Sequence, residues 1–212
     1  MKWCVNHRRG YGASTGGHPA ASIERDAADC RALLAALEIP AAHIVGKSYS
    51  GAVALQAAVD APPRVRTLAL LEPALLFVPS AARFAEAVAP IVQRYASGDP
   101  AGAIEDFMAL VWGRDWRVNL EQRVPGGSGQ AERDTAVAFE ASNARLVTQL
   151  VLYLGGTDSG PLFAEIRDLV RAWFPQTEDQ MLAGANHSFP ITHPTQVADL
   201  LATFFARHPL AA

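Results

Sequence analysis

A short segment between two apolar runs has the residue types of a nucleophile on a tight turn. The runs at 42–45 and 52–59 predict a strand followed by a helix. Between them lies the segment Gly46-Lys47-Ser48-Tyr49-Ser50-Gly51. A nucleophile on a strand-to-helix turn has a strained backbone and needs small residues two positions to either side. Gly46 and Ser50 meet this need around Ser48. We therefore expect Ser48 to be the nucleophile.

A serine hydroxyl is a weak nucleophile and needs a general base. His187 lies on a loop of small residues after a predicted strand at 179–182, and Asp158 follows a predicted strand at 149–154. The carboxyl ends of parallel strands lie at one edge of a sheet, so both side chains can meet Ser48 there. The chain order Ser48, Asp158, His187 is typical of this turn architecture. We expect His187 to accept the serine proton and Asp158 to orient the imidazole.

Other residues near these positions could contribute to the same site. Glu72, at the end of a predicted strand at 65–71, is the alternative acid. The N–H of Tyr49, directly after the nucleophile, is the expected oxyanion donor. Four large apolar residues could line an acyl pocket or form only the core of the helices that carry them: Phe107, Met108, Trp112 and Trp116.

The remaining pattern predicts an α/β protein with a mostly parallel sheet flanked by helices. Apolar strand and helix runs alternate before residue 79 and after residue 146. The intervening segment has helical periodicity and no strand signal, with a kink or split expected at Pro90. We expect a core formed by 1–78 and 147–212, and a helical cap formed by 79–146.

These motifs together resemble the α/β-hydrolase superfamily, and in particular its small, helical-capped, esterase-like members. The segment from Arg9 to Ser14 looks like the superfamily's Arg-Gly-x-Gly-x-Ser loop, and His43 to Gly51 looks like its nucleophile elbow. Glu72-Pro73 stands where the chain usually leaves the sheet for the cap. The acid turn and the histidine loop correspond to 155–158 and 184–187. The resemblance covers nearly the whole chain and implies a serine hydrolase.

The chain also departs from this family pattern. Lys47 replaces a common histidine, and Ser50 replaces a usual glycine. Trp3 to Val5 is expected to be a short strand, and the family's earlier strands and His-Gly-type oxyanion loop are expected to be absent, giving a shortened fold with an open sheet edge. Loss of one oxyanion donor typically lowers the rate by about 10²–10³. Homodimerisation through the open edge is one interpretation of this feature.

Composition narrows the classes of function. The 212 residues include 18 Lys+Arg and 21 Asp+Glu, a net charge of −3, with no basic cluster beyond Arg8-Arg9, so a nucleic-acid partner is not expected. The two cysteines cannot form a disulfide framework, which favours a cytoplasmic location. No apolar run reaches the ~20 residues of a membrane span, so no membrane association is expected.

The sequence therefore predicts a cofactor-free serine hydrolase without a metal site. Its expected substrate is a small, largely apolar molecule whose ester bond is cleaved through an acyl-enzyme. A related thioester, amide or carbon–carbon bond could stand in place of the ester. The alternative is a truncated or degenerate hydrolase that binds a small apolar ligand without efficient turnover.

Overall fold

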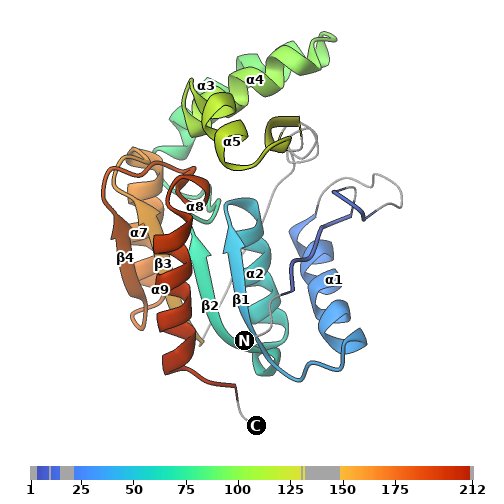
Figure 1. Ribbon diagram of the computed structural model, residues 1–212, viewed down its shortest axis with the longest axis vertical. Coiled ribbons are helices and arrows are strands. Elements are labelled where there is room, and N and C mark those ends of the chain that lie inside the picture. The colour runs from blue at the N-terminus through green and yellow to red at the C-terminus, as the bar shows by residue number, and fades with distance from the viewer. Residues whose placement is uncertain (1–3, 10, 15–21, 130, 132–148, 211–212) are drawn as a thin grey trace.

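The computed structural model describes residues 4–9, 11–14, 22–129, 131 and 149–210, which form a parallel α/β architecture (Figure 1). Within these ranges, four strands pair side by side in chain order, each parallel to its neighbours. The strands are β1 (Ala42–Lys47), β2 (Val65–Leu71), β3 (Leu150–Gly156) and β4 (Glu178–Leu182). This arrangement confirms the predicted fold class of a parallel sheet flanked by helices.

The helices of the described residues lie before, between and after the strands in the chain. Near the N-terminus, the Ser22 hydroxyl caps the first helix by accepting from the Arg25 N–H at 3.4 Å. None of these helices is long and apolar enough to cross a bilayer. The helices are α1 (Ile23–Ala36), α2 (Tyr49–Asp60), the 3₁₀ turn η1 (Pro62–Arg64), α3 (Ala81–Ala96), α4 (Pro100–Trp112), α5 (Trp116–Arg123), α7 (Pro161–Trp173), α8 (Phe189–Thr192) and α9 (Pro194–Arg207).

Both faces of the sheet are buried, which explains the continuous apolar runs of the central strands. Because successive side chains of a strand point to opposite faces, Leu68 and Leu70 of β2 pack with α1, α2 and α7. Ala69 and Leu71 pack on the other face with α9. Helices on both faces therefore fix the strands, and hence the loops at their carboxyl ends.

Helices α3, α4 and α5 lie over the carboxyl-end edge of the sheet (Figure 1). The split expected at Pro90 does not occur: α3 continues through it, since proline removes only one helix hydrogen bond and α3 packs along α4. Of the segment predicted to be helical at 79–146, residues 130 and 132–146 lie outside the described residues. The division into a core and a cap with boundaries at 79 and 146 stays a prediction.

Strand β1 forms one edge of this sheet, since its only strand neighbour among the described residues is β2. The short strand expected at Trp3 to Val5 is not formed where it is described: Cys4 and Val5 are irregular, and Trp3 lies outside the described residues. The following residues are instead held on α1 by ion pairs from Arg8 and Arg9. Dimerisation through the β1 edge stays a prediction.

Candidate active site

The turn predicted between β1 and α2 is present and has a strained backbone at Ser48. Ser48 has φ 50° and ψ −122°, a left-handed conformation that a non-glycine residue rarely adopts. Its N–H donates to the Leu71 carbonyl at 3.0 Å, and its carbonyl accepts from the N–H groups of Gly51 and Ala74, both at 2.9 Å. These bonds to β2, to α2 and to the segment after β2 keep Ser48 in this conformation.

Two glycines allow the close contacts of this turn. A Cβ atom on Gly46 would lie 2.3 Å from the Ser50 carbonyl oxygen, and one on Gly51 would lie 2.6 Å from Cβ of Pro73. Both distances are far below van der Waals contact. The requirement for a small residue at position 46 is therefore a direct consequence of the turn, as the sequence predicted.

His187, on the loop after β4, forms a buried pair with Glu72. Its Nδ1 lies 2.5 Å from Glu72 Oε2, and both side chains are excluded from solvent, with exposed fractions of 5% and 0%. The second carboxylate oxygen, Oε1, accepts from the Gly156 N–H at 2.8 Å. An ionised Glu72 therefore holds the proton on Nδ1, which leaves Nε2 as the ring acceptor.

The predicted pairing of Asp158 with His187 is not found. Asp158 is exposed, its carboxylate accepts from the neighbouring Thr157 hydroxyl at 2.9 Å, and Glu72 occupies the place beside Nδ1. The physical reason is that the β3 end contacts the histidine loop through backbone. The Asp158 N–H donates to the Ala185 carbonyl at 2.8 Å, and a Cβ on Gly156 would lie 2.1 Å from that same carbonyl oxygen. The alternative acid, Glu72, is thus the one brought to the imidazole.

Phe163 of α7 completes the surroundings of the imidazole. Its ring stacks on that of His187, with centroids 4.2 Å apart and an interplanar angle of 14°. Burial and the nearby positive charge of Lys47 lower the pKa of His187 to about 4, although Glu72 acts in the opposite direction. The imidazole is therefore neutral at pH 7, as a general base must be.

Ser48, Tyr49 and His187 line one large cavity of about 1390 Å³ beneath α3 and α4. Its wall is mainly apolar and includes three of the four proposed pocket residues, Phe107, Met108 and Trp112. Trp116 does not line this cavity. It is 1% exposed, packs in the core of the α4–α5 layer, and donates its indole N–H to Glu105 at 2.9 Å. Trp116 is therefore a core residue.

The histidine loop is also tied to the helices above the sheet. The Asn186 side-chain amide donates to the Trp112 carbonyl at 3.2 Å, at the end of α4. The other end of the same side chain accepts from the N–H and hydroxyl of Ser188, at 2.9 and 2.6 Å. Asn186 therefore links the residue next to His187 directly to the roof of the cavity.

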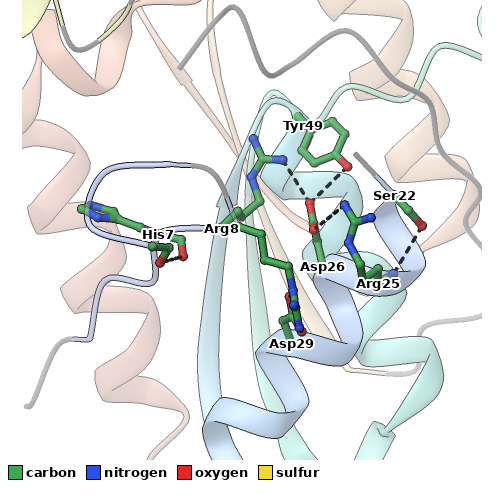
Figure 2. A network of polar contacts seen from close by, with 9 residues as sticks. His7, Arg8, Ser22, Arg25, Asp26, Asp29 and Tyr49 are labelled. Carbon is green, nitrogen blue, oxygen red and sulfur yellow. Dashed lines mark hydrogen bonds and ion pairs between the residues drawn. The ribbon is translucent and has the colours of Figure 1, made fainter. Parts of the chain in front are cut away.

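A polar network fixes the side chain of Tyr49, the first residue of α2. Figure 2 shows Arg8, Tyr49 and Arg25 meeting at Asp26 of α1. Arg8 pairs with Asp26 at 3.0 Å and lies 4.1 Å from the centroids of both the Tyr49 and Tyr11 rings. The Tyr49 hydroxyl donates to Asp26 at 3.2 Å. As the first helical residue, Tyr49 has no intrahelical acceptor for its backbone N–H, which suits it to the expected oxyanion role.

Sequence reasoning missed Phe163 and Arg8 as neighbours of the site. Phe163 lies on the apolar stripe of an amphipathic helix, where nothing distinguishes a core residue from one that stacks on an imidazole. Arg8 directly precedes the Arg-Gly-x-Gly-x-Ser segment, so its proximity to the elbow could have been inferred from that resemblance.

Comparison with known proteins assigns the family. The family model described as the alpha/beta hydrolase fold matches residues 3–194. The chain belongs to the α/β-hydrolase fold family. This assignment confirms the resemblance inferred from the motifs, and the family supports hydrolase activity. A comparison of this α/β-hydrolase-fold protein with curated proteins found no match.

Solved esterase structures share the architecture of this α/β-hydrolase-fold protein. A thermophilic esterase from Thermogutta terrifontis, with malate bound, is 18% identical with a TM-score of 0.73, over 95% of this chain and 79% of that one. The esterase RhEst1 from Rhodococcus sp. ECU1013 is 21% identical with a TM-score of 0.70, over 95% and 79%. The esterase EaEST from Exiguobacterium antarcticum is 15% identical with a TM-score of 0.71, over 93% and 78%. At these identities the likeness establishes the fold.

Proposed function

We propose that this protein is a serine hydrolase that cleaves small, largely apolar esters through an acyl-enzyme. The observation that carries the proposal is the buried His187–Glu72 pair, on a cavity that the strained Ser48 also lines. In this proposal Ser48 is the nucleophile, His187 the general base and Glu72 the acid that orients it. The esterase names of the structural neighbours agree with this choice of substrate.

In the first half of the reaction, the Ser48 hydroxyl attacks the ester carbonyl while Nε2 of His187 accepts its proton. Glu72, bonded to Nδ1, stabilises the imidazolium that forms. The oxyanion of the tetrahedral intermediate accepts a hydrogen bond from the Tyr49 N–H, aided by the positive end of α2. Collapse of the intermediate breaks the ester C–O bond, and the imidazolium gives its proton to the departing alcohol. The acyl group remains on Ser48.

In the second half, a water molecule takes the place of the alcohol. His187 removes a proton from this water, which attacks the acyl carbonyl of Ser48. The second tetrahedral intermediate expels the serine oxygen, which recovers a proton from the imidazolium, and the carboxylic acid leaves. No step requires an electron donor or acceptor. Thioesters and amides can follow the same sequence with a different leaving group.

Steady-state hydrolysis of short p-nitrophenyl esters tests this function. We expect turnover by the wild type that falls by at least about 10³-fold in both Ser48→Ala and His187→Ala, because the nucleophile and its base act as one unit. Ser50→Ala is the matched control, since it removes the neighbouring hydroxyl, and we expect it to remain active. Equal activity of wild type and Ser48→Ala would contradict the proposal. Thermal stabilisation by an ester analogue without any turnover would instead support the binding-protein alternative.

A further inference from the structure

One cation on the cavity wall has no part in the mechanism above. Lys47 directly precedes Ser48 at the end of β1, and its side chain lines the same cavity. Its Nζ lies 5.1 Å from the centroid of the Trp112 ring, so the ammonium is next to the roof formed by α4. Among the described residues that line the cavity, none is an aspartate or glutamate.

Arg8, the other Lys or Arg side chain among the described residues of this wall, is already neutralised. Arg8 bonds to Asp26 at 3.0 Å and lies between two tyrosine rings. By contrast, no carboxylate oxygen of the described part of the chain lies within 4.0 Å of the Lys47 ammonium. Lys47 is therefore a cation in a mainly apolar cavity, directly beside the nucleophile and without an ion-pair partner within 4.0 Å among the described residues.

We propose that Lys47 binds a carboxylate carried by the substrate, so that the preferred substrates are half-esters of short aliphatic dicarboxylic acids. This inference rests on the proposed ester cleavage and adds a substrate class to it. The carboxylate end would bind Lys47, the methylene chain would lie along the apolar wall, and the ester carbonyl would face Ser48. Removal of both charges from bulk water strengthens such a bond and makes it selective against neutral esters.

Burial and one neighbouring negative charge determine the pKa of Lys47. Burial lowers the pKa of Lys47 to about 8, while the negative charge of Glu72 acts in the opposite direction. His187, the other titratable group close by, is neutral at pH 7, and Trp112 on α4 carries no charge. The ammonium is thus protonated at pH 7 and loses its charge as the pH rises through about 8, so selectivity for carboxylate-bearing esters should weaken above that pH.

The kinetic test compares two esters that differ in charge and by one methyl group. Mono-4-nitrophenyl adipate carries a carboxylate, and methyl 4-nitrophenyl adipate carries its neutral methyl ester. We expect the ratio of kcat/KM for the anionic over the neutral ester to fall by about tenfold or more in Lys47→Met at pH 7, and to be largely retained in Lys47→Arg. Because both kcat/KM values are measured on the same variant, a general loss of activity cancels in their ratio. An unchanged ratio in Lys47→Met would overturn the inference.

A binding test separates this inference from the proposed function. In the Ser48→Ala background, calorimetry measures the affinity for monomethyl adipate and for dimethyl adipate, with and without Lys47→Met. We expect the half-ester to bind more tightly, and this preference to disappear with Lys47. If the wild type hydrolyses neither ester but this preference is present, the hydrolase proposal fails and the carboxylate site stands. Equal affinities for the half-ester and the diester would contradict the carboxylate site, whether or not the wild type hydrolyses either ester.

Discussion

The substitution Glu72→Gln separates the two candidate acids and can be analysed atom by atom. One carboxylate oxygen, Oε1, accepts from the Gly156 N–H at 2.8 Å, and the other, Oε2, lies 2.5 Å from Nδ1 of His187. Glutamine keeps its carbonyl oxygen toward Gly156, because of the two ends of its amide only the oxygen can accept from an N–H. Its NH₂ group then faces His187 and forces Nδ1 to be the acceptor. The ring proton moves to Nε2, so Nε2 can no longer accept the serine proton.

The expected loss of rate follows from this change of tautomer. Replacement of the acid by its amide in a serine–histidine–acid triad lowers kcat by about 10⁴-fold, or ~5.5 kcal/mol at 1.36 kcal/mol for each factor of ten. We expect a loss of about 10³–10⁴ for Glu72→Gln, because the 0% exposed side chain leaves no room for water to replace the carboxylate. The substitution preserves shape, so the fold should survive.

Stopped-flow and steady-state hydrolysis of p-nitrophenyl butyrate measure this loss, with circular dichroism to verify folding. Asp158→Asn is the matched control: its carboxylate is exposed and, within the described part of the chain, bonds only Thr157, so we expect kcat to change by less than about threefold. A large loss in Asp158→Asn together with an active Glu72→Gln would refute the assignment of Glu72 as the orienting acid.

Three further outcomes follow from the site. Wild-type activity on a neutral ester should disappear as the pH falls through about 4, because the neutral form of His187 is the base. Phe163→Leu should move this loss of activity to higher pH, because it removes the ring that buries the imidazole. The pH–rate profile measures both effects. Arg8→Met should lower the free energy of unfolding in urea by about 1–3 kcal/mol, because it leaves the buried carboxylate of Asp26 short of a partner. Arg9→Met removes an exposed pair and should lower the same free energy by less. Gly46→Ala should lower the melting temperature and abolish activity, because its Cβ would lie 2.3 Å from a backbone oxygen; an active, equally stable variant would contradict the tight turn.

The sheet and the turns that carry Ser48 and His187 could be predicted because their signals are local. Buried parallel strands are continuous apolar runs, and β2 matches its predicted range of 65–71. The elbow around Ser48 requires a glycine at position 46, and the loop before His187 is made of small residues, so both turns are visible in the sequence.

The choice of acid could not be predicted, because Glu72 and Asp158 both follow a strand and carry the same chemical group. The direction of each side chain determines which carboxylate reaches His187. That direction depends on backbone conformation and on contacts between residues far apart in sequence. Glu72 has φ 43°, and its N–H donates to the Leu154 carbonyl at 3.1 Å, across to β3. At Asp158 the backbone, rather than the carboxylate, contacts the histidine loop.

The strand expected at Trp3 to Val5 is not formed at the two residues that the structure describes, Cys4 and Val5, for a related reason. A strand forms only where a neighbour supplies hydrogen bonds, and apolar composition alone does not reveal whether one is present. Here Arg8 and Arg9 of the same segment form ion pairs to Asp26 and Asp29 of α1, which hold the chain against a helix.

Covalent labelling tests the central claim most directly. Incubation with a fluorophosphonate, followed by proteolysis and mass spectrometry, identifies the side chain that attacks the phosphorus. We expect one adduct for each chain, on Ser48, formed much more slowly in Glu72→Gln and absent in Ser48→Ala. An adduct on another serine, or no adduct with correctly folded wild type, would contradict the claim that this turn activates Ser48.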